Sequence, residues 1–399
     1  MLRQGGQNSS TGSSEQNSIN ETQSNTPGGI PRLRQVSSDP VAGATIFSIP
    51  IPQSTGDGTS TATTSDYVVY VAQGSGNIYE EPVNSVTQEL LSATTIPKVN
   101  VAFVGQNNTV AYQYFKDDNE TLETFLGQII PDTSVATTSY EAVPGTSNST
   151  ENFGKVVGSF LPQDIYRFDV APSGDRIFYL MQNIDSDTGY LANIDGTMAS
   201  PVITTPLREW DISWPNTNNI LMTTSPDSSA NGYLFSLNLP TQNFTQILGD
   251  IPGLTAIANP DLSYVIYSES TYDSFETHIY RVADGLDRVI QLKTLPEKCT
   301  WSTTNNDIAY CAVPSSIPAA DYPESWYRGD VSFSDNLWRF NIDAGTSTEL
   351  LDFSSATQGG SADMIDLALD QGDHYIIFKN KKDNTLWEYD LDDTANSLQ

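Results

Sequence analysis

The chain has 399 residues, of which 38% are hydrophobic and 10% aromatic, enough apolar material for a packed core. Its 18 Lys and Arg stand against 49 Asp and Glu, and a net charge of -31 disfavours nucleic acid and anionic lipid as partners. No stretch approaches the roughly 20 consecutive apolar residues that span a bilayer, so we expect no direct membrane insertion by this chain.

The first 30 residues differ in composition from the rest. Residues 1–30 are rich in Ser, Asn, Gln, Thr and Gly and offer almost nothing to bury, which predicts a disordered tether. We predict a single β domain over 31–393 and a short C-terminal tail over 394–399. A folded domain on such a tether often has an export or membrane segment upstream, so we expect a secreted or surface-tethered protein.

Seven units of one design follow along the chain. Each has an apolar strand, a turn rich in Pro, Asn, Asp and Gly, a second apolar strand, and a third strand with an aromatic residue beside an aliphatic one; most add a more polar fourth. The first two units are divergent and span 44–92 and 98–161. The other five open with hairpins at 164–180, 209–223, 254–268, 298–311 and 364–378.

The spacing of these units predicts a β-propeller. Prolines that open successive units are 44, 46 and 44 residues apart, from Pro162 to Pro206, Pro252 and Pro296. This is about the length of one four-stranded propeller blade. Helical repeats of similar period are excluded, because the units are rich in Val, Ile, Thr and Tyr and alternate with period two.

The last unit lacks a fourth strand, and the chain has one to spare. Residues 31–37, PRLRQVS, resemble the outer strands and precede the first unit. We therefore predict an all-β, seven-bladed propeller closed by this N-terminal strand, which completes the last blade and removes an open sheet edge. Six or eight blades are the alternatives.

Three insertions interrupt the units, at 50–65, 132–153 and 314–335. The third is the candidate partner-binding loop, because Trp, Tyr and Arg are enriched at binding hot spots. Its candidate residues are Tyr322, Trp326, Tyr327 and Arg328. The alternative is that Tyr322 and Trp326 fold back and cap the neighbouring blade.

Cys299 and Cys311 are the only cysteines, and a turn lies midway between them. They can therefore face each other across two paired strands, which predicts a disulfide and an oxidising compartment. The alternative is a pair of small core residues, since Phe168 and Leu180 hold the corresponding places in another unit.

Few residues indicate chemistry. His278 and His374 are the only histidines, and both fit strand positions. No nucleophile elbow, phosphate loop or dinucleotide fingerprint occurs, so we assign no catalytic, cofactor-binding or metal residues. Asp185 and Asp187 lie in a turn that is either solvated or a calcium site without the later ligands of an EF-hand.

Two segments carry a family resemblance. APSGDRIFYL and GYLANIDG (171–180 and 189–196), with the similar ANPDLSYVIYS (258–268), resemble the WD-repeat-like motif of TolB-type propellers. Ser173 and Gly174 replace the Asp-Gly of that motif. The resemblance covers the repeat only, and it implies a propeller and an extracytoplasmic, protein-binding role.

These observations favour a non-enzymatic, extracytoplasmic propeller that binds protein or glycan at the cell envelope as a monomer. One alternative is a polysaccharide hydrolase or lyase that uses carboxylates at the central channel, although the sequence does not single out a pair among 49 acidic residues. Another is a structural component of a surface layer. Acidic and aromatic side chains that converge at one mouth of the channel would favour the enzyme.

Overall fold

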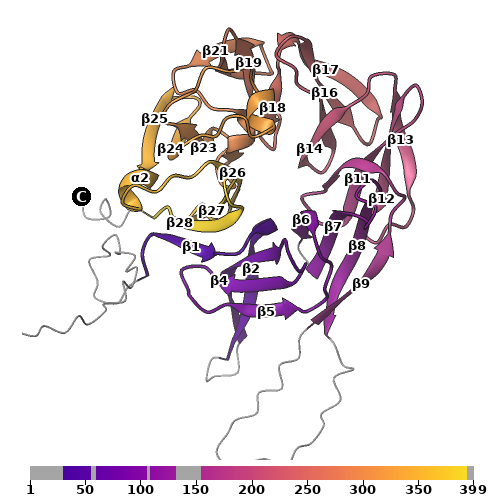
Figure 1. Cartoon of the computed structure of the whole chain (residues 1–399), viewed down its shortest axis with the longest axis vertical. Coiled ribbons are helices and arrows are strands. Elements are labelled where there is room, and N and C mark those ends of the chain that lie inside the picture. Colours follow the sequence, from indigo (N-terminus) through magenta and orange to yellow (C-terminus); the bar gives the residue numbers. More distant parts are fainter. Residues whose placement is uncertain (1–29, 55–59, 106–107, 132–153, 393–399) are drawn as a thin grey trace, which may run out of the picture.

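The computed structural model describes residues 30–54, 60–105, 108–131 and 154–392. The predicted tail, the insertion at 132–153 and all of the predicted tether except residue 30 lie outside these ranges. The described part is an all-β propeller arrangement in which the sheets follow one another around a ring in chain order (Figure 1).

Five sheets have four antiparallel strands each, and we name each of these sheets by the strand at its inner edge, which faces the centre of the ring (Figure 1). Their strands are β10 (Ile165–Val170), β11 (Arg176–Gln182), β12 (Asp187–Asn193) and β13 (Ser200–Thr205); β14 (Trp210–Asn216), β15 (Asn219–Thr224), β16 (Asn231–Asn238) and β17 (Asn243–Pro252); β18 (Thr255–Ala258), β19 (Tyr264–Thr271), β20 (Ser274–Arg281) and β21 (Leu286–Ile290); β22 (Cys299–Trp301), β23 (Ile308–Pro314), β24 (Asp335–Asn341) and β25 (Thr346–Leu351); and β26 (Met364–Leu369), β27 (Tyr375–Asn380), β28 (Thr385–Asp390) and β1 (Leu33–Ser37).

The sixth sheet has eight strands, so the prediction of seven separate blades is wrong: five blades stand beside one larger sheet. Its order is β2 (Val41–Ser54), β3 (Ser60–Ala72), β4 (Ile78–Pro82), β5 (Glu89–Ser92), β9 (Gly154–Phe160), β8 (Leu122–Pro131), β7 (Thr109–Phe115) and β6 (Val99–Gly105). The join is a parallel pairing of Ser92 with Gly154. A Cβ on Gly154 would lie 2.8 Å from the Leu91 carbonyl oxygen, so the missing side chain permits this close approach.

The predicted insertion at 50–65 is, in its described part, an extension of a hairpin. Strands β2 and β3 continue through it as one long hairpin and pair as far as Ser54 and Ser60. Residues 55–59 lie outside the described ranges.

The N-terminal strand β1 pairs with β28, where the sequence placed it. Leu33 lies opposite Tyr389, and Gln35 lies opposite Trp387. The last described strand thus lies beside the first one (Figure 1).

The core is divided into clusters that lie mostly between neighbouring sheets. Phe178 and Leu180 of β11, for example, pack against Trp210 of β14 and Ile220 of β15. Residues of β2 and β3 pack in the same way against β27 and β28, which closes the ring. Burial between sheets, roughly proportional to the apolar area removed from water, is therefore what holds successive sheets together.

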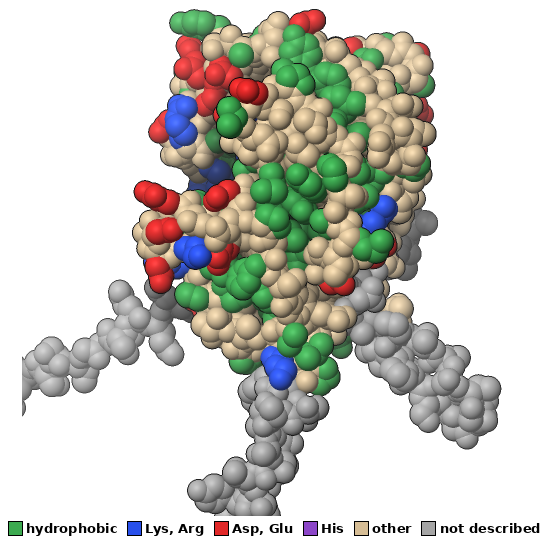
Figure 2. All heavy atoms as spheres, turned by 90° about the vertical axis from the view of Figure 1, so that its right-hand side faces the viewer, with side chains coloured by type: hydrophobic (Ala, Val, Ile, Leu, Met, Phe, Trp, Pro, Cys, Tyr) green, Lys and Arg blue, Asp and Glu red, His purple; other side chains and the backbone are tan. Residues whose placement is uncertain are grey.

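The outer surface is mixed in character. Figure 2 views the side on which β13 and β17 lie in Figure 1, and hydrophobic side chains gather across its middle while most acidic ones lie toward one edge. Exposed apolar residues include Val157 and Phe160 of β9. No helix within the described ranges is long and apolar enough to cross a bilayer.

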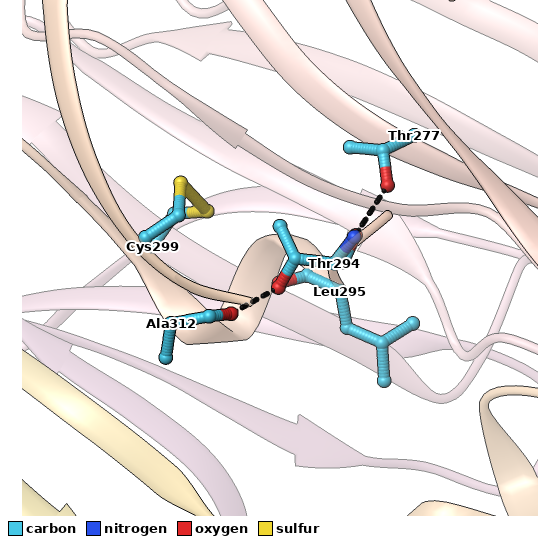
Figure 3. Close-up of a disulfide and its surroundings, with 6 residues drawn as sticks. Thr277, Thr294, Leu295, Cys299 and Ala312 are labelled. Carbon is cyan, nitrogen blue, oxygen red and sulfur yellow. Dashed lines mark hydrogen bonds between the residues drawn. A yellow bond between two sulfur atoms is a disulfide. The ribbon is translucent and has the colours of Figure 1, made fainter. Parts of the chain in front are cut away.

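Cys299 and Cys311 form a disulfide between directly paired positions of β22 and β23. Thr294 lies close by, as Figure 3 shows: its N–H donates to Thr277 Oγ1 at 2.8 Å and its hydroxyl donates to the Ala312 carbonyl at 2.5 Å. The disulfide and Thr294 together fix the junction between the β18 and β22 sheets.

Replacing Cys299 and Cys311 together with Ala should lower the free energy of unfolding by about 3 kcal/mol, because the unfolded chain loses a covalent loop. Urea unfolding of the variant and the wild type measures the difference. The wild type in reductant serves as the control, and its intact mass should rise by about 2 Da on reduction. Equal stabilities, or no change in mass, would show that the bond is absent.

Candidate functional site

A cavity of about 450 Å³ lies where the inner strands of three sheets face one another. We call it the central cavity. Strands β10, β14 and β18 form its wall, and the short helices η2 (Pro296–Lys298) and α1 (Glu324–Tyr327) each add one side chain. Its lining residues are Arg167, Asp211, Ile212, Ser213, Thr223, Leu254, Thr255, Ala256, Ile257, Glu297 and Tyr327.

Arg167 and Asp211 form an ion pair across two inner strands. Arg167 Nε donates to Asp211 Oδ1 at 2.8 Å, and the two residues are 44 positions apart, one repeat length. Their side chains are 52% and 40% exposed, so a dissolved ligand can reach them. Solvent screens such a pair, which therefore adds little to stability.

Glu297 and Tyr327 also meet in this cavity. The Tyr327 hydroxyl donates to Glu297 Oε1, and Glu297 Oε2 is buried and accepts no hydrogen bond among the described residues. Burial raises the pKa of the Glu297 carboxyl; the Tyr327 hydrogen bond opposes this shift and the charge of Asp211 adds to it. Burial and Glu297 hold the pKa of the Tyr327 hydroxyl well above its usual range.

The structure separates the four candidate residues of the 314–335 loop. Tyr322 and Trp326 are 1% and 3% exposed and pack with Phe275 of β20, so these two cap the neighbouring blade. Tyr327 lines the central cavity; the residue as a whole is 41% exposed, whereas its hydroxyl group is buried against Glu297. Arg328 is exposed and pairs with Asp330 at 2.9 Å, within the loop itself.

The turn with Asp185 and Asp187 is not built as a cation site. Asp187 is buried and its Oδ2 accepts hydrogen bonds from the Tyr166 hydroxyl at 2.5 Å and the Glu209 N–H at 3.0 Å. Asp185 is exposed. Throughout the described ranges, no three His, Cys, Asp or Glu side chains are grouped as a metal site requires.

The two histidines lie in different parts of the ring, and no site brings them together among the described residues. His278 of β20 stacks on Tyr267, and its Nδ1 is 3.2 Å from Asp287 Oδ1. His374 precedes β27, and the hydrogen bond of its Nδ1 with Asp370 raises the pKa of the imidazole.

Sequence reasoning missed the three charged residues of the central cavity, namely Arg167, Asp211 and Glu297. The sequence contains a pattern that could have identified two of them. Arg167 and Asp211 are charged residues inside apolar inner strands, one repeat apart, and side chains at that position face the ring centre. Glu297 carries no such signal, since it lies in a connection between sheets.

Neither a protein-family model nor a curated protein matches the sequence. Solved structures do match in fold. An oligogalacturonate lyase in complex with manganese is 9% identical, with 89% of this chain and 99% of that chain covered and a TM-score of 0.51. TolB from Acinetobacter baumannii is 11% identical, with 87% and 79% covered and a TM-score of 0.44.

The β-propeller domain of the Trilobed protease from Pyrococcus furiosus is 10% identical, with 87% of this chain and 98% of that chain covered and a TM-score of 0.47. At such identities the likeness concerns the fold alone. This chain is similar to propeller proteins that include TolB, and its resemblance to the TolB-type repeat extends no further than that arrangement.

Proposed function

We propose that the protein is an extracytoplasmic binding module that takes a glycan into the central cavity. The observation that carries this proposal is the convergence of Arg167, Asp211, Glu297 and Tyr327 on one solvent-reachable cavity. Sugar hydroxyls both donate and accept hydrogen bonds. They therefore complement a site that offers carboxylate acceptors beside a guanidinium donor.

The size and lining of the cavity favour a glycan over a folded protein. The cavity volume of about 450 Å³ lies within the range of about 300–1,000 Å³ that is common for small-ligand pockets. A folded protein would instead need a surface of about 800 Å² on each partner to form a stable interface. Apolar residues such as Ile212 and Ile257 line the same cavity and suit the C–H faces of a sugar ring. The disulfide supports an oxidising compartment, as outside the cytoplasm.

Neutral variants of the two carboxylates test the proposal. Asp211→Asn and Glu297→Gln should each weaken binding of the best ligand on a glycan array by about tenfold or more, because hydrogen bonds to charged groups contribute about 1.5–3 kcal/mol. Calorimetry with the selected glycan gives the affinities. Asp343→Asn, which changes an exposed carboxylate outside the cavity, is the matched control and should bind normally.

The proposal is wrong if the wild type binds nothing on the array, or if both cavity variants bind as tightly as the wild type. If the wild type binds a protein instead of a glycan, and the two cavity variants lose that binding, the site is correct and the ligand class is wrong.

A second candidate function is cleavage of a polysaccharide. Two carboxyl groups, Asp211 and Glu297, face the same cavity, and the raised pKa of Glu297 suits a proton donor to a leaving group. New reducing ends or unsaturated products after incubation with polysaccharides, lost in Glu297→Gln, would favour this function.

A further inference from the structure

Lys298 is fully buried between two carboxylates where the β22 and β26 sheets meet. Its Nζ lies 2.7 Å from Asp335 Oδ2 and 2.6 Å from Asp363 Oδ1, and none of the three side chains is exposed. Nζ also donates to the Met364 carbonyl at 2.9 Å. Burying three charged groups carries a large desolvation free energy, which their mutual attraction need not offset. The cluster is therefore a candidate for a chemical role as well as a structural one.

Aromatic rings surround the amine. Lys298 Nζ lies 5.1 Å from the centre of the Trp326 ring and 5.3 Å from that of Phe333. Lys381, a second cation, lies 4.7 Å from the Trp326 ring, and burial together with Lys298 lowers its pKa. These rings enclose the Lys298 amine together with the Asp335 and Asp363 carboxylates, so the nucleophile and its target are held side by side in one desolvated pocket.

Asp363 is held as the acceptor of that attack. Its Oδ2 accepts hydrogen bonds from Trp326 Nε1 at 3.0 Å, from the Phe333 N–H at 3.0 Å and from the Ser332 hydroxyl at 3.1 Å. Its Oδ1 faces Lys298. Donors fixed around one oxygen stabilise the negative charge that develops there when a nucleophile adds to the carbon.

Asp335 is placed to carry protons between the two. Its Oδ2 contacts Lys298 Nζ, and its Oδ1 is buried without a hydrogen-bond partner among the described residues. Burial raises the pKa of this carboxyl to about 6, so a proton can reside on it near neutral pH.

We propose that Lys298 Nζ and Asp363 Cγ condense to an intramolecular isopeptide bond. Asp335 takes a proton from the ammonium group, the amine adds to Cγ, and a C–N bond forms. Asp335 returns that proton to Oδ1 and relays a second from nitrogen to the same oxygen. The C–O bond then breaks and one water leaves. Ammonium and carboxylate thus give amide and water, with no other reactant.

The bond joins residues 65 positions apart and links the start of the β22 sheet to the start of the β26 sheet. It complements the non-covalent closure by β1 and is independent of any ligand in the central cavity.

Mass spectrometry of the purified full chain tests the bond directly. The denatured wild type should weigh about 18 Da less than its disulfide-bonded sequence, the mass of one water. Peptide mapping should recover a branched peptide that joins residues 298 and 363. A mass equal to that of the disulfide-bonded sequence overturns the proposal, and so does a water loss that maps to any other pair of residues.

Variants separate the reaction from simple ion pairing. Lys298→Arg removes the nucleophile and Asp335→Asn removes the proton carrier, while each keeps a polar side chain at its position. Neither variant should lose water, so each should have the mass calculated for its own disulfide-bonded sequence. Lys379→Arg is the matched control, since Lys379 also pairs with an aspartate, Asp366 at 2.7 Å, that is mostly exposed. It should still lose one water. Water loss in Lys298→Arg would contradict the assignment, and the peptide map decides the matter if a variant does not fold.

Discussion

Replacing Arg34 with methionine should lower the free energy of unfolding by about 3–5 kcal/mol, because it leaves two buried carboxylates without their cation. Arg34 Nε and Nη2 donate to the two oxygens of Glu388 at 2.9 and 2.7 Å, and Nη1 donates to Glu81 at 2.5 Å. The three side chains are at most 7% exposed. Urea unfolding, which leaves ion pairs unscreened, is the appropriate measurement.

The position of this cluster explains why the effect should be large. Arg34 lies on β1, Glu388 on β28 and Glu81 on β4, so one guanidinium ties the closing strand to the last sheet and to the eight-stranded sheet. Loss of this cation weakens the junction between the first and the last described strands. We therefore expect the β1–β28 amides to lose hydrogen-exchange protection before the rest of the ring.

Arg32 provides the matched control, since it is exposed; among the described residues its guanidinium donates to the Asp390 carbonyl and lies 5.0 Å from the centre of the Tyr389 ring. Arg32→Met should cost less than about 1 kcal/mol. An equal loss in Arg32→Met and Arg34→Met would contradict a special role for the buried cluster.

Glu81 gives this cluster a pH dependence. Burial raises the pKa of Glu81; Arg34 opposes the shift and Glu388 adds to it. The folded state therefore holds this proton more tightly than the unfolded state. The associated stability is fully present below the unfolded pKa, about 4.3, and is lost as the pH rises through the folded pKa. Glu81→Gln lacks this dependence and serves as a second control.

Local sequence patterns predicted the strands and the closure well. Each hairpin of the last five units corresponds to a pair of strands, from β10 and β11 to β26 and β27. Period-two alternation and turn residues act over a few positions, so a single sequence displays them. The spare strand at 31–37 was recognisable for the same reason.

The merged sheet and the central cavity depend on contacts that no local pattern displays. At Gly154 two outer strands from different units pair with each other. Counting repeats in the sequence does not predict such a pairing between units. Glu297 and Tyr327 are 30 positions apart and come together only because the loop folds back over the β18 sheet. The aromatic composition of residues 314–335 marked this loop as a candidate site, but it did not predict which residues line the cavity and which are buried.

Two pairs of chain neighbours, one in η2 and one in α1, each place one side chain in the cavity and one in the core. Glu297 and Tyr327 face the central cavity, whereas their chain neighbours Lys298 and Trp326 are buried. The packing of Trp326 therefore sets the position of Tyr327 in the cavity. A change at Trp326 should disturb both stability and ligand binding.

Trp326→Ala should accordingly lower the free energy of unfolding by about 3–5 kcal/mol, since it leaves a large hole among buried aromatic rings. It also removes the indole N–H that donates to Asp363. Urea unfolding measures the loss, and Arg328→Ala is the control from the same loop, with an expected change within about 0.5 kcal/mol. A Trp326→Ala protein as stable as the wild type would show that the loop does not cap the blade and would return Trp326 to the set of residues free to bind a partner.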